Sequence, residues 1–162
     1  MEPLSFASQP PRGPREKLAG IVFTARVVDK LRASLPGGEL NGYIAYTGMS
    51  VAWRHYTKID LAELCGVVES AQSEAEVEAW IEARTAHLDK AKINEKLERF
   101  DSSRMPDDLR PLFERLIPAE LRERYPLIFD LLEADDARLY PATDSGRKSR
   151  LSTPPRSERP EP

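Results

Sequence analysis

Cysteine and histidine are scarce in this sequence. Cys65 is the single cysteine among the 162 residues, and His55 and His87 are the two histidines. One cysteine cannot form an internal disulfide, which favours a reducing, cytoplasmic location. Two distant histidines and one cysteine make a poor set of zinc ligands, so the sequence predicts no metal site. Cys65 lies between Leu64 and Gly66 and is interpreted as a small buried apolar side chain.

Long apolar runs and phosphate-binding glycine loops are missing as well. No segment approaches the roughly 20 apolar residues that span a bilayer, and no basic stretch followed by an apolar one marks a secretory signal. Pro36-Gly37-Gly38 does not fit a nucleotide-binding loop, and no Gly-x-Ser-x-Gly motif occurs. We therefore expect no membrane association and no cofactor. No nucleophile–base pair or metal set indicates an enzyme.

The charge of the chain is small overall but unevenly placed. The net charge is −3, and residues 141–162 carry five basic and three acidic side chains. Residues 1–15 carry two arginines and one glutamate, which leaves 17 basic and 23 acidic residues, a net charge of −6, on residues 16–140. Nucleic-acid-binding domains usually present a basic face, so this acidic body makes a nucleic-acid partner unlikely on sequence grounds.

Helical spacing of apolar residues dominates the middle of the chain, and strand-like alternation is nearly absent. We predict an all-α fold, an irregular multi-helix bundle in a single domain over residues 14–140. We expect proline-rich residues 1–13 to form an extended N-terminal arm and residues 141–162, rich in Pro, Ser and Arg, to form a disordered tail. Helices are expected from Pro14 to about Leu35, after the capping boxes at Asp60 and Ser73, and over residues 49–58, 88–100, 107–117, 119–125 and 127–139.

The expected first helix carries charged residues on one side of an otherwise apolar surface. At about 100° per residue, Arg15, Arg26, Asp29 and Lys30 share one sector with the small Ala19. Buried arginines are costly unless they are paired, and a guanidinium matches a carboxylate or phosphate through two parallel hydrogen bonds.

The N-terminus of this helix would add free N–H groups that favour anions. The pattern predicts an anion pocket in which Arg12 and Arg15 hold the anion, Arg26 reaches it and Asp29 orients Arg26. The candidate binding residues are Arg12, Arg15, Arg26, Asp29, Lys30 and Tyr43.

Two structural explanations compete with this interpretation. The charged residues can be a solvated strip, or Arg15 can pair with an acid on a neighbouring helix, since structural ion-pair networks produce the same pattern. Tyr43 belongs to an aromatic group with Tyr46, Trp53 and Tyr56 that either walls the pocket or fills the core.

The same segment resembles a known family. Pro10-Pro11-Arg12-Gly13-Pro14-Arg15-Glu16-Lys17-Leu18-Ala19-Gly20, followed by Arg26, Asp29 and Lys30, is similar to the opening of a bacterial family described only as a domain of unknown function (number 5069). A weaker likeness continues through residues 53–60 and 73–80. The resemblance covers mainly residues 10–94, so the helices after Asp101 are expected to be additions. It implies a small helical protein and implies no activity.

We therefore expect a non-enzymatic binding or interaction module with an anion pocket beside the first helix, whose partner is an anionic small molecule or a protein. The alternative is an enzyme that acts on a phosphorylated or carboxylated metabolite, with Asp29 or Tyr43 moving the proton. A third and weaker interpretation is a nucleic-acid-associated protein that works through the basic tail.

Overall fold

The structure is a computed structural model, and it describes residues 1–141 of the chain. The regular secondary structure of this part of the chain is helical apart from one small hairpin, so the predicted all-α fold is confirmed. The predicted tail, from residue 142 onward, lies outside the described residues. The elements in chain order are β1 (Lys17–Leu18), β2 (Ile21–Val22), α1 (Thr24–Ser34), α2 (Met49–Thr57), α3 (Leu61–Ser70), α4 (Glu74–Thr85), α5 (Lys90–Glu98), the 3₁₀ turn η1 (Ser102–Arg104), α6 (Arg110–Leu116), α7 (Ala119–Arg124) and α8 (Ile128–Leu139).

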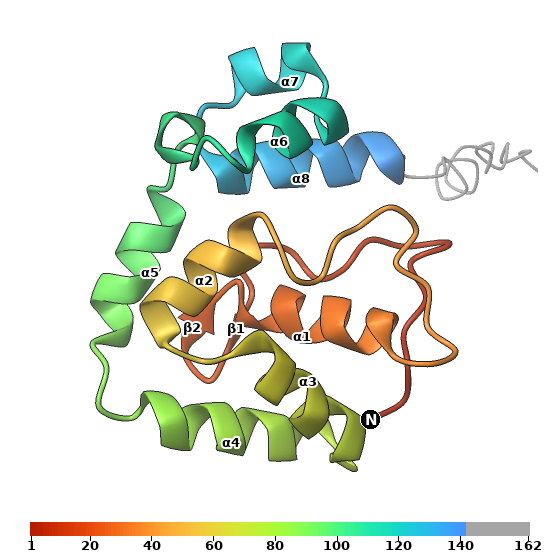
Figure 1. The fold of residues 1–162 in the computed structure, drawn as a ribbon, viewed down its shortest axis with the longest axis vertical. Helices are drawn as coiled ribbons and strands as arrows, with labels where there is room; N and C mark the ends of the chain where they lie inside the picture. The colour runs from red at the N-terminus through yellow and green to blue at the C-terminus, as the bar shows by residue number, and fades with distance from the viewer. Residues whose placement is uncertain (142–162) are drawn as a thin grey trace, which may run out of the picture.

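Helix α1 lies in the middle of the molecule, with α2, α3 and the hairpin around it and α4 at the lower edge of the view (Figure 1). Helix α5 leads to the upper layer, which consists of α6, α7 and α8 (Figure 1). Nine of the eleven residues of α1 are buried, as the sequence predicted for a central helix. None of the helices in residues 1–141 combines the length and the apolar character that a membrane span needs.

The start of the first helix was predicted wrongly. Helix α1 begins at Thr24, ten residues after Pro14, and the intervening segment forms the antiparallel hairpin in which Lys17 faces Val22 and Leu18 faces Ile21. Ala19 and Gly20 form its turn, both with positive φ (52° and 74°), as two-residue hairpin turns require. Ala19 therefore occupies a turn and leaves no groove on a helix.

Other helix boundaries follow the expected local signals. The Asp60 side chain accepts hydrogen bonds from the backbone N–H groups of Ala62 and Glu63, and it thereby caps α3. Ser73 caps α4 by accepting from the backbone of Glu76. Helix α1 ends at Ser34, shortly before the Pro-Gly-Gly segment. The two N-caps are confirmed, because their geometry depends only on neighbouring residues.

The N-terminal arm is extended and packs against the segment that follows α1. The backbone N–H of Phe6 donates to the carbonyl of Glu39 at 2.9 Å, and the N–H of Glu39 donates to the carbonyl of Leu4 at 2.9 Å. The Phe6 side chain is only 2% exposed and contacts the edge of the Tyr43 ring. The arm therefore contributes to the core, and its path places Arg12 beside α1.

Candidate functional site

Three charged residues of α1 are buried. Arg26, Asp29 and Lys30 are 2%, 4% and 6% exposed. Burying a charge is costly unless the charge is paired and hydrogen-bonded. The partners of each residue therefore indicate which charges are satisfied within the protein and which one could meet a ligand.

Arg26 is held by a carboxylate from the upper layer. Its Nη1 and Nη2 donate to Oδ2 and Oδ1 of Asp136 on α8 at 2.7 and 3.0 Å, and Nη1 also donates to the carbonyl of Arg12 at 3.0 Å. The Tyr43 hydroxyl donates to Asp136 Oδ1 at 2.7 Å, and the guanidinium carbon lies 5.4 Å from the centre of the Tyr43 ring. Burial is the main cause that raises the pKa of Tyr43, followed by its hydrogen bond to Asp136. Arg26 and Asp136 thus form a neutral, buried pair that joins α1 to α8.

Asp29 holds Arg12 from the arm, whereas the spacing on the expected helix predicted that it would orient Arg26. Nε and Nη2 of Arg12 donate to Oδ2 and Oδ1 of Asp29 at 2.9 and 2.8 Å. The backbone N–H of Arg12 also donates to Asp29 Oδ2 at 2.9 Å. On its other side, Arg12 Nη1 donates to Glu74 Oε1 of α4 at 3.0 Å. These contacts, with the Asp29 hydrogen bond as the largest cause, raise the pKa of Arg12. Two carboxylates therefore neutralise Arg12.

Arg15 lies apart from this cluster. It is 43% exposed and forms ion pairs with Asp130 and Glu133 on α8 at 2.5 and 2.6 Å. This matches the alternative in which Arg15 pairs with an acid on a neighbouring helix. The expected contribution of a helix N-terminus to an anion site at Arg12 and Arg15 was wrong, because α1 begins only at Thr24.

Lys30 has a different environment. Its Nζ donates to Ser50 Oγ of α2 at 2.7 Å and lies 5.2 Å from the centre of the Phe23 ring. Among residues 1–141 this is its only side-chain hydrogen bond, and no carboxylate oxygen lies within 4.0 Å of Nζ. Burial, reinforced by the nearby charge of Arg26, lowers the pKa of Lys30 to about 7, although Asp136 acts in the opposite direction.

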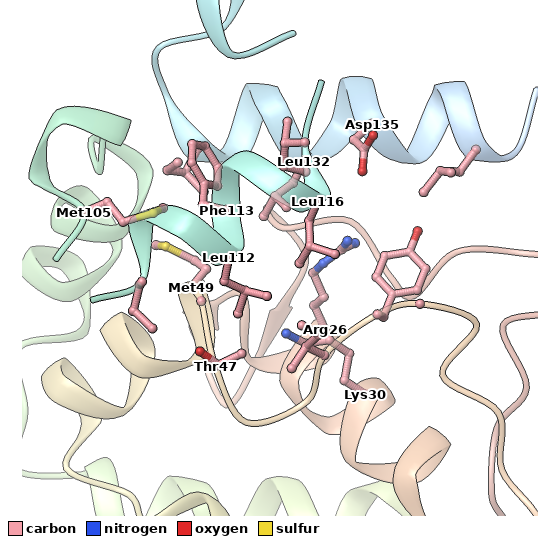
Figure 2. A pocket seen from close by; sticks show the side chains of 18 of the residues that line it. Arg26, Lys30, Thr47, Met49, Met105, Leu112, Phe113, Leu116, Leu132 and Asp135 are labelled. Carbon is pink, nitrogen blue, oxygen red and sulfur yellow. The ribbon is translucent and has the colours of Figure 1, made fainter. Parts of the chain in front are cut away.

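Lys30 and Arg26 line a cavity of about 320 Å³ between α1 and the upper layer. Figure 2 shows both side chains on one side of this cavity and the side chains of Leu112, Leu116 and Leu132 across it. Most of the remaining wall is also apolar, and it comes from Phe23, Ile44, Met49, Met105, Leu109, Phe113, Ile117, Ile128 and Leu139.

The charges in the cavity wall nearly cancel. Arg138 donates to Asp135 Oδ1 from Nε and Nη2 at 3.0 and 2.7 Å, and Arg26 is paired with Asp136 just behind the wall. Lys30 is the one lining cation among residues 1–141 that has no carboxylate partner. The cavity is therefore an apolar chamber with one uncompensated amine.

Five of the six predicted site residues thus lie together, and Arg15 does not. Arg12, Arg26 and Asp29 are joined through hydrogen bonds, Tyr43 joins them through Asp136, and Lys30 lies one turn after Arg26. Sequence reasoning missed Asp136, Ser50 and the cavity wall from α6. Adjacent acids at the otherwise apolar face of α8 are the signal that could have revealed Asp136, because buried acids indicate buried cations.

Metal binding has no obvious location in the described part of the chain. Residues 1–141 contain no group of three His, Cys, Asp or Glu side chains placed to hold a metal ion. His55 and His87 are exposed, and Cys65 is a free, half-buried thiol. The chemistry available at the site is therefore hydrogen bonding, charge pairing and the reactivity of one amine.

A comparison with models of known families shows the family of this chain. The family model described as "Domain of unknown function (DUF5069)" matches residues 8–138. The chain belongs to this family. The match extends through α8 to Arg138, so the expectation that the helices after Asp101 are additions was wrong, and all residues that line the cavity except Leu139 lie within the matched range. A comparison with curated proteins gives no match.

Proposed function

We propose that this DUF5069 protein is a non-enzymatic binding module whose cavity takes a small molecule with an apolar body and one anionic group. The observation that carries the proposal is Lys30, a buried amine without a carboxylate partner within residues 1–141, in the wall of a mostly apolar cavity. We place the protein in the cytoplasm, because its cysteine is a free thiol.

The size and chemistry of the cavity support a small ligand. Its volume of about 320 Å³ lies at the lower end of the range of roughly 300–1,000 Å³ that is typical of ligand pockets. Another cavity of about 220 Å³ shares Met49, Met105 and Leu109 with it, so an apolar ligand has room to extend between α2 and the segment that precedes α6. An anionic group beside Lys30 would offset the cost of keeping its ammonium form buried.

The candidate proton-transfer residues support binding over catalysis. Asp29 accepts three hydrogen bonds from Arg12, so its oxygens are occupied. The Tyr43 hydroxyl already donates to Asp136, and its raised pKa keeps it protonated. A general base needs a free lone pair within reach of a substrate proton, but Asp29 does not line the cavity and Tyr43 is protonated. The enzyme that acts on an anionic metabolite therefore remains the less favoured alternative.

Calorimetric titration with three ligands of equal chain length tests the proposal. Decanoate and decyl phosphate should bind the wild-type protein, and decanol should bind at least about tenfold more weakly, because it cannot pair with the Lys30 ammonium. Lys30→Met should remove this preference, whereas Lys58→Met, which alters an exposed lysine, should retain it. Equal binding of decanol and decanoate to the wild type, or an unchanged preference in Lys30→Met, would contradict the proposal.

A further inference from the structure

We propose that Lys30 also captures aldehydes or ketones that enter the cavity and holds them as a reversible imine. The inference rests on the proposed function, because it requires that the cavity admit a small molecule. It goes further by assigning Lys30 a covalent role and by naming the carbonyl group as the part of the ligand that reacts.

The position of the amine is suited to this reaction. Lys30 is one of the residues that line the cavity, so a carbonyl group inside the cavity lies next to this side chain. Nζ donates its hydrogen bond to Ser50 Oγ at 2.7 Å, and a neutral amine that donates keeps its lone pair free. Figure 2 shows Lys30 facing the space below Leu112.

The surroundings of Nζ favour the neutral, nucleophilic form. Lysines that form imines are activated by desolvation in an apolar pocket or by another cation nearby, and Lys30 has both. The Lys30 side chain is buried, and Arg26 precedes it by one helical turn. Consistent with this, the pKa of Lys30 is lowered to about 7.

Apart from Arg26, the charged groups near Lys30 come from α8, and the loop before α2 adds the titratable Tyr43. Asp136 on α8 acts on Lys30 electrostatically, but it already accepts hydrogen bonds from Arg26 and Tyr43. Asp135 of α8 is paired with Arg138. The wall contributed by α6 is apolar. No described group is therefore placed to restore a full positive charge on Lys30 at neutral pH.

The reaction needs no oxidant or reductant. The Nζ lone pair attacks the carbonyl carbon, so a C–N bond forms while the C=O π electrons move to oxygen. A proton passes from nitrogen to that oxygen, and the Ser50 hydroxyl is near enough to relay it. The C–O bond then breaks, the hydroxyl group leaves as water with the remaining N–H proton, and the nitrogen electron pair completes the C=N bond. Hydrolysis runs the same steps in reverse and releases the ligand.

Reductive trapping with decanal tests the inference on the full chain. The protein is incubated with decanal and cyanoborohydride at pH 7, and alkylated lysines are located by peptide mass spectrometry. A lysine with a pKa near 7 has a neutral fraction roughly 1,000-fold larger at this pH than an ordinary lysine. We expect Lys30 to be modified at least about tenfold faster than the exposed Lys58 and Lys96, and we expect this preference to shrink toward pH 10.

Two further measurements keep the test decisive. Excess decanoate should protect Lys30, but not Lys58, from alkylation. This measurement uses the wild-type protein, so it does not depend on the folding of any variant. Lys30→Arg should lose the fast modification, while Lys58→Met should keep it. Even modification of all lysines, or an unmodified Lys30, would overturn the imine. If decanoate still showed Lys30-dependent binding by calorimetry, only the covalent step would be overturned and the proposed function would stand.

Discussion

Arg26 and Lys30 lie one turn apart on α1, and both are buried, but their partners differ. Arg26 meets the two oxygens of Asp136, which cancels its charge inside the protein. Within residues 1–141, Lys30 donates a hydrogen bond only to the neutral Ser50 hydroxyl, and it lines the cavity. Two cations that look equivalent on a helical wheel therefore have different roles: one joins two layers of the fold, and the other is available to a ligand.

The largest effect should come from breaking the Arg26 pair. Asp136→Asn leaves a buried guanidinium without its counter-charge, and such losses cost about 3–5 kcal/mol in the free energy of unfolding. Urea denaturation measures this value. Asp130→Asn is the matched control, because Asp130 pairs with the exposed Arg15 and should cost less than about 1 kcal/mol. Equal losses in the two variants would contradict a structural role for the buried pair.

Removing the partner of Arg12 should have a smaller effect. Asp29→Asn weakens three hydrogen bonds from Arg12 but leaves its contact with Glu74, so we expect a loss of about 1.5–3 kcal/mol. Glu74→Gln is the comparison, since that carboxylate is more exposed and should contribute less. Urea denaturation of both variants compares the two losses. A larger loss of unfolding free energy in Glu74→Gln would contradict Asp29 as the main partner of Arg12.

Lys30 should give the molecule a distinctive pH dependence. Its folded pKa of about 7 lies below the ordinary value near 10.4. Between these values the unfolded chain holds a proton that the folded protein lacks. Stability therefore rises with pH across this window by about 1.4 kcal/mol per unit, and it is lowest below pH 7, where the buried amine is charged.

The variant Lys30→Met lacks this titration. Its advantage in stability over the wild type should be largest below pH 7 and should shrink steadily toward pH 10. Thermal unfolding in buffers of increasing pH measures the difference, with Lys58→Met as the control that follows the wild type. A constant difference between wild type and Lys30→Met would show that the lysine has an ordinary pKa in the folded protein.

Arg15 should contribute least. Its ion pairs with Asp130 and Glu133 are exposed to solvent, so Arg15→Ala should change the free energy of unfolding by no more than about 1 kcal/mol. High salt should remove most of that difference, because exposed pairs are screened. A salt-independent loss above 2 kcal/mol would place Arg15 with the structural cations instead.

Features that depend on neighbouring residues could be predicted from the sequence better than contacts between distant residues. The caps at Asp60 and Ser73 were predictable because both partners lie within one turn of the chain. The start of α1 was missed because Leu18, Ile21 and Phe23 are buried in the hairpin segment, and buried residues there imitate helical spacing.

In the candidate site, too, contacts between residues far apart in the sequence could not be predicted. The stripe containing Arg26, Asp29 and Lys30 was visible from their spacing on one helix. Their partners were not, because Asp136 lies 110 residues after Arg26 and Ser50 lies 20 residues after Lys30. Helical periodicity identifies which residues share a face, but only the packing of α8 and α2 decides which charge is neutralised.

The most direct test is the titration of Lys30 itself. Proton–carbon NMR of protein labelled at the lysine Cε follows each amine separately, and Lys30→Arg assigns the resonance. We predict a midpoint near pH 7 for Lys30 in the free protein, an upward shift when decanoate is added, and midpoints near 10.4 for exposed lysines. A midpoint near 10.4 for Lys30 that decanoate does not move would contradict the claim that this amine is buried, unpaired and open to the cavity.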